Sequence, residues 1–173
     1  MKSEIKLYNV MFPIWFLVLF PIAWIVVIPA NFVIDLLVLF LTMKLCKMPD
    51  IKQNLKSAVL KSWLMGFAAD LIGTAGMFLA AVGGDLLPDP YRVWFNNKIG
   101  LGVMMNPFSS IGSFLWTVFF VALAGFLIYL FNLKFCLKKT TLDDIQRKKL
   151  ALSMAIFTAP YLFFLPTTLL YQY

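Results

Sequence analysis

Three long apolar runs dominate the chain. Residues 10–43 and 63–82 contain one charged side chain each, Asp35 and Asp70, and residues 109–133 contain none. Runs of 18 or more apolar residues are typical of transmembrane helices, which need about 20 residues to cross the hydrocarbon core of a bilayer. With a further apolar run near the C-terminus, the pattern predicts an all-α fold: a polytopic integral membrane helical bundle.

The first apolar run allows two interpretations of the number of spans. The interpretation that we favour has a short interfacial lead-in from Tyr8 to about Leu19 and then four transmembrane helices, at about 21–43, 62–82, 112–132 and 150–171. Pro160 and Pro166 should bend the last one. The alternative has five, with a hairpin turn at Pro29–Asn31. Four is preferred because isolated prolines are tolerated in membrane helices when neighbouring groups satisfy the freed carbonyls.

Residues at the predicted helix starts resemble N-caps. Asp50 follows Pro49, and Asn106-Pro107 precedes two serines. Thr141 stands three residues before Asp144, in a spacing close to that of a capping box. We therefore expect helices to begin directly after these positions.

Charge adds an orientation to this picture. The net charge is +7, and residues 44–61 and 133–149 together hold 11 of the 15 lysines and arginines. Basic loops of membrane proteins usually lie in the cytoplasm, so we expect both loops there, in a cell (plasma) membrane, with loop 83–111 outside. Because orientation accounts for the positive charge, binding to nucleic acid is not expected.

Composition supports a single membrane-embedded domain over residues 1–173. Apolar residues make up 62% of the chain and charged residues 13%, with a mean hydropathy of +0.87. A water-soluble chain of this length could not bury so much apolar surface. The first apolar run is also longer than the apolar part of a secretory signal, so we expect no cleavage.

Catalytic chemistry finds little support. The chain contains no histidine, which removes the commonest general base and metal ligand. Cys46 and Cys136 are too widely spaced for a zinc or iron–sulfur motif, and both stand beside lysines on the predicted cytoplasmic side. We therefore assign no catalytic, cofactor-binding or metal-binding residue and expect a protein that is not an enzyme.

The two intramembrane aspartates are the most informative residues. A charged group in hydrocarbon costs about 2.5–3.5 kcal/mol on insertion scales and is retained mostly where it is used or paired. Asp35 shares a helical stripe with Asn31 and Thr42, and Thr74 lies one turn beyond Asp70. The candidate polar site comprises Asn31, Asp35, Asp70 and Thr74.

Small residues beside Asp70 predict a helix-packing seam, formed by Gly66, Ala69, Gly73 and Gly76. We expect Asp70 to face the bundle interior within hydrogen-bonding reach of a polar side chain from another helix, with Asp35 the leading candidate. Two adjacent carboxyls would share a proton or hold a cation. Alternatively, each aspartate is a hydrogen-bonded packing residue. Trp63, next to Lys61, is interpreted as an anchor at the bilayer edge.

Three functions agree with these observations. The first is a non-enzymatic accessory, assembly or protective component that binds another membrane protein or lipid. The second is a small ion- or proton-coupled transporter or channel that uses Asp35 and Asp70, and a homo-oligomer is expected there because four helices enclose little space. The third, ranked last, is a membrane-embedded enzyme acting on lipid. Expected partners are the bilayer itself and another membrane protein or a second copy of this chain.

Overall fold

The computed structural model describes Trp15 and residues 21–169, and this part of the chain is helical throughout, without a strand. The four longest helices are α1 (Pro21–Leu45), α2 (Ile51–Gly83), α5 (Ile111–Phe131) and α6 (Asp144–Thr158). Two short helices, α3 (Tyr91–Phe95) and α4 (Leu101–Met105), lie between α2 and α5. Single 3-10 or π turns complete the fold, at Gly84–Leu86, Asn96–Gly100, Pro107–Ser109, Asn132–Cys136, Leu137–Lys139, Tyr161–Phe164 and Thr167–Leu169. The predicted all-helical fold is confirmed.

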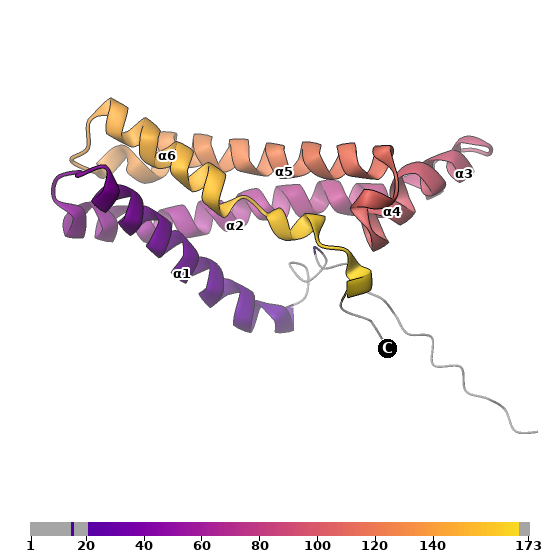
Figure 1. The fold of residues 1–173 in the computed structure, drawn as a ribbon, viewed down its shortest axis with the longest axis horizontal. Helices are drawn as coiled ribbons and strands as arrows, with labels where there is room; N and C mark the ends of the chain where they lie inside the picture. The colour runs from indigo at the N-terminus through magenta and orange to yellow at the C-terminus, as the bar shows by residue number, and fades with distance from the viewer. Residues whose placement is uncertain (1–14, 16–20, 170–173) are drawn as a thin grey trace, which may run out of the picture.

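The four long helices pack in a ring. α2 packs against α5 and α1, and α6 packs against α5 and α1. Figure 1 shows α2 and α5 lying side by side along the molecule, whereas α1 diverges from them towards its N-terminal end. The four helices therefore form a closed bundle at one end, and α1 separates from α2 and α5 towards the other end.

Within the described part of the chain, three helical segments are long and apolar enough to cross a membrane: Trp24–Leu45, Ile51–Leu86 and Ile111–Lys139. The predicted fourth span is not one bent helix. α6 ends at Thr158, and Ala159 has an extended backbone with a ψ of 150° before the chain continues in two short 3-10 turns. The residue before a proline is disfavoured in the helical conformation, and Pro160 follows Ala159.

The alternative of a hairpin at Pro29–Asn31 is wrong, because α1 continues through Pro29 without a break. The indole of Trp63 on α2 donates a hydrogen bond to the carbonyl oxygen of Ile28, at 3.1 Å. The two prolines thus have opposite effects: one is accommodated inside a helix, and the other follows the end of one. The predicted lead-in before residue 21 lies mostly outside the described residues.

Two of the three predicted caps are wrong in detail. Asp50 precedes α2 but adopts a left-handed conformation with a φ of 46°, and its side chain caps nothing. α6 begins with a complete capping box formed by Asp143 and Gln146, two residues beyond the predicted Thr141. Asn106 caps the 3-10 turn Pro107–Ser109, and Ser110 caps α5 by accepting a hydrogen bond from the Ser113 N–H at 3.1 Å.

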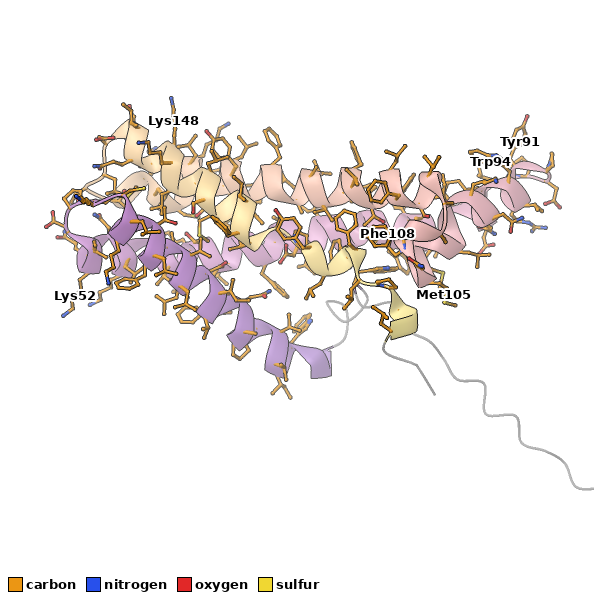
Figure 2. All side chains as sticks on the ribbon, viewed as in Figure 1. Lys52, Tyr91, Trp94, Met105, Phe108 and Lys148 are labelled. Carbon is orange, nitrogen blue, oxygen red and sulfur yellow. The ribbon has the colours of Figure 1, made fainter. Side chains whose placement is uncertain are left out.

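We call the closed end of the bundle the basic end, since it holds the loops 46–50 and 137–143. Figure 2 shows Lys52 and Lys148 at this end and Tyr91 and Trp94 at the opposite one. A cluster of buried apolar side chains from all four long helices forms its core: Leu39, Met43, Met48, Ala58, Ala69, Ile128, Leu137, Leu142, Leu150, Ala151 and Met154.

Buried polar side chains at the basic end are hydrogen-bonded. Asn54 donates to the Pro49 carbonyl at 2.9 Å and accepts from the Thr141 N–H at 2.9 Å, which ties the two loops together. Ser62 donates to the amide oxygen of Asn132 at 2.7 Å. Asn54 and Ser62 of α2 and Asn132 of the turn after α5 are fully buried, and their hydrogen bonds hold these parts of the chain together.

Candidate functional site

A cavity of about 520 Å³ lies where α1 separates from the bundle. Its walls are the cavity-facing residues of α1 and α2, Phe108, and the segment 157–166 that follows and includes the end of α6. α6 ends at Thr158, and within the described residues the two short 3-10 turns that follow it, rather than a regular helix, line the cavity opposite α1. In Figure 2, Phe108 lies beside this C-terminal segment, in agreement with its ring contact to Phe164 at 6.2 Å between centroids.

Asp35 of α1 faces this cavity. The residue is only 5% exposed, and the chain around it is apolar. Its carboxyl lies against Gly66 of α2, where a Cβ atom would stand 3.5 Å from Oδ2. Asn31, one turn earlier on α1, also lines the cavity. The carboxyl of α1 thus lies directly over Gly66 of α2.

Asp70 of α2 lines the same cavity, one turn beyond Gly66. Its Oδ1 atom is buried and has no hydrogen-bond partner within the part of the chain that the structure describes. The expected hydrogen bond to a polar side chain of another helix is thus absent at this atom. Asp35 lies close enough for the two negative charges to repel each other when both carboxyls are ionised.

Thr74, the remaining residue of the predicted polar site, and Thr42, which shares the α1 stripe, both lie outside the cavity. Thr74 is fully buried with an unpartnered Oγ1 atom, and it does not line the cavity. Thr42, the third member of the α1 stripe, pairs with Ser153 of α6 at 2.6 Å between hydroxyl oxygens. The structure therefore brings together Asn31, Asp35 and Asp70 and leaves Thr74 apart.

The four small residues of the predicted seam are all buried, and they face two different partners. Gly66 faces Asp35 of α1, as described above. A Cβ atom at Gly73 would stand 3.1 Å from the Phe163 ring and 3.3 Å from Ala124 of α5, and one at Gly76 would overlap the Phe120 ring of α5. The Gly76 carbonyl also accepts a hydrogen bond from the Trp116 indole at 3.0 Å.

Two parts of the cavity were not recognised in the sequence. Trp63, interpreted there as an anchor at the bilayer edge, lines the cavity wall, and its N–H is bonded to α1. Its ring also packs edge-on against Phe32 at 5.7 Å. The segment 157–166 supplies half of the wall, and the pair of prolines at 160 and 166 was the available signal that it leaves the helix.

Within Trp15 and residues 21–169, no group of three or more histidine, cysteine or acidic side chains could hold a metal ion. Cys46 and Cys136 are both free thiols, the first exposed and the second buried. Comparisons with protein-family models, with curated proteins and with solved structures gave no match.

Proposed function

We propose that this chain is a non-enzymatic membrane component, of an accessory, assembly or protective kind, that binds a lipid-like molecule in the cavity beside α1. The observation that carries this proposal is the exposed apolar rim. Phe157 and Leu162 line the cavity and are 67% and 66% exposed, within the run predicted as the last crossing. The volume of about 520 Å³ suits a small-molecule ligand, for which cavities of about 300–1,000 Å³ are usual.

The proposal includes a membrane arrangement. We place the basic end in the cytoplasm and residues 83–111 outside, in a cell (plasma) membrane, because residues 44–61 and 133–149 hold most of the lysines and arginines. Four crossings then result if α6 and the two 3-10 turns after it cross the bilayer together. Non-helical backbone is tolerated at membrane depth where it lines a cavity, as segment 157–166 does.

Native mass spectrometry of the protein released from detergent micelles tests this function. We expect a small-molecule adduct on the unmodified protein and its loss from Gly66→Leu, which places a side chain in the cavity. Ala75→Leu is the matched control, because it also introduces a leucine into α2, at an exposed position. Equal adducts on both variants, each with an unchanged melting temperature, would refute ligand binding in the cavity. An adduct of protein mass would instead favour a partner protein or a second copy of the chain.

A second candidate is ion- or proton-coupled transport, and one observation favours it. Asp35 and Asp70 share one cavity between helices, as a coupling site for a proton or cation requires. Proteoliposomes loaded with a pH-sensitive dye would show proton movement, and Asp35→Asn and Asp70→Asn should abolish it. No movement by the unmodified protein leaves ligand binding as the function.

A further inference from the structure

The charges that line the cavity have one sign. Among the described residues, its lining includes the carboxyls of Asp35 and Asp70 and the amide of Asn31, and no lysine or arginine. The two ion pairs between side chains in the described part of the chain are Arg92 with Asp89 and Arg147 with Asp144, both far from the cavity in sequence. No basic side chain there neutralises the two carboxyls.

Asp35 is buried but forms no stabilising polar interaction within the described residues. At 5% exposure it is buried beyond nine-tenths, yet it makes no hydrogen bond or ion pair within the described residues. Asp70 carries a second buried and unpartnered carboxyl oxygen in the same cavity. Buried polar groups nearly always have partners, and neither carboxyl has a hydrogen bond or an ion pair within the described residues. Two such carboxyls that face one cavity therefore suit a ligand that brings the missing partner.

Aromatic rings line the same cavity as these carboxyls. Trp63, Phe67 and Phe163 line the cavity close to them in the fold, on α2 and on the turn Tyr161–Phe164. The indole of Trp63 is held in place by its bond to the Ile28 carbonyl and by the edge-on Phe32 ring. Aromatic faces attract organic cations, and carboxyls beside them add direct charge attraction. The combination suits an ammonium-type group better than it suits a hydrated metal ion.

The exposed rim of the cavity suits a ligand that also has a large apolar part. Tyr161 and Leu162 are more than half exposed, and both line the cavity. A phospholipid head would bring a phosphate towards Asp35 and Asp70, and the lining offers no basic side chain to receive it. Phosphate recognition in proteins relies on arginine, lysine or clustered N–H donors. A cation without a phosphate is therefore the better match.

We infer that the cavity binds a lipophilic organic cation, with its charged group between Asp35 and Asp70 and its apolar body along the aromatic wall and rim. This inference rests on the proposed function, because it specifies the ligand of the same cavity. It makes the two aspartates the residues that select the ligand by charge.

Two probes of matched shape and opposite charge test the inference: tetraphenylphosphonium and tetraphenylborate. Binding would be measured by equilibrium dialysis against the full chain in lipid nanodiscs, with empty nanodiscs subtracted. We expect the cation to bind and the anion not to bind. The double variant Asp35→Asn/Asp70→Asn should weaken binding of the cation at least tenfold, whereas Asp85→Asn, at an exposed carboxyl outside the cavity, should leave it unchanged.

The outcomes separate the inference from the proposed function. Equal binding of both probes, unaffected by the double variant but abolished by Gly66→Leu, would retain a lipid-like ligand and overturn the cation. Absence of binding by either probe would overturn the cation and count against the cavity as a ligand site. Displacement of the cation by phosphatidylethanolamine, compared with phosphatidylglycerol nanodiscs, would show that a lipid headgroup supplies the ammonium and would overturn the exclusion of phosphate. A melting curve for each variant confirms that it is folded.

Discussion

Buried polar side chains on α2 meet different surroundings at the basic end and at the cavity. Asn54 and Ser62 are fully buried, and each is bonded to a polar group of another part of the chain. Asp70, further along the same helix, has a buried carboxyl oxygen without a partner in the described part of the chain. The comparison separates polar residues that hold the bundle together from polar residues that the fold leaves available. A buried group of the first kind stabilises the protein, and one of the second kind costs stability.

The largest loss of stability is expected when the hydrogen bonds of Asn54 at the basic end are removed. Asn54→Leu removes the bonds to Pro49 and Thr141 and leaves a buried N–H and a buried carbonyl unsatisfied. Each orphaned group costs about 1–3 kcal/mol, so we expect the free energy of unfolding to fall by roughly 3 kcal/mol. Denaturation by sodium dodecyl sulfate in mixed micelles measures this free energy. The control variant Gln53→Leu, at the exposed amide that precedes Asn54, should leave the free energy of unfolding nearly unchanged.

A smaller loss is expected where α2 meets both α5 and the cavity wall. Gly73→Leu would force side-chain atoms into the space held by Phe163 and Ala124, and overpacking of this kind costs about 1–3 kcal/mol. Leu71→Ala should cost less, because Leu71 is 36% exposed and lies away from this contact. Thermal melting in detergent gives the melting temperatures of the two variants. Identical melting temperatures would mean that α2 and α5 do not depend on close contact at Gly73.

Replacing Asp70 at the cavity by leucine, as for Asn54 at the basic end, compares the two ends most directly. Asp70→Leu removes a carboxyl that has an unpartnered buried oxygen, so the free energy of unfolding should stay the same or rise by about 1 kcal/mol. Binding of the cationic probe should fall in the same variant. The measurement is the denaturation assay used for Asn54→Leu. A loss of stability like that of Asn54→Leu would show that Asp70 has a structural partner and would remove the contrast between the two ends.

The smallest effect concerns two thiols at the basic end and leaves stability unchanged. Cys46 is exposed and Cys136 is fully buried, so a maleimide should label the first rapidly and the second only after unfolding. Mass spectrometry of the digested protein reports each thiol separately. In intact cells, a membrane-impermeant maleimide should label neither, because we propose that the basic end is cytoplasmic. Labelling of Cys46 from outside would reverse the orientation.

The apolar runs predicted the helices well, and they failed where neighbours decide the backbone. Pro29 and Pro160 stand in similar apolar sequence, yet α1 continues through the first and α6 ends before the second. Hydropathy does not distinguish the two prolines. A residue before a proline is disfavoured in the helical conformation, and this applies to Ile28 and Ala159 alike, yet only Ala159 leaves the helix. Neither this local preference nor the run of apolar residues therefore distinguishes the two positions.

The candidate polar site was predictable in part for a similar reason. A charge within an apolar run stands out in the sequence, which identified Asp35 and Asp70, and helical spacing placed Asn31 beside Asp35. Spacing on one helix could not show that Thr74 faces elsewhere or that Thr42 pairs with Ser153 of α6. The cavity itself depends on the end of α6, so its wall at 157–166 was outside the reach of a pattern within single helices.

The early end of α6 also has a consequence for the order of assembly during biogenesis. A span that inserts on its own must satisfy all of its backbone groups internally, and Pro160 and Pro166 interrupt that pattern after Thr158. Thr167 instead uses its hydroxyl to donate to the Met104 carbonyl at 2.9 Å, and the Phe163 ring packs against Gly73. These contacts exist only after α2 and α4 are in place. Docking of the C-terminal segment is therefore a late step of assembly, after the helices that it contacts have formed.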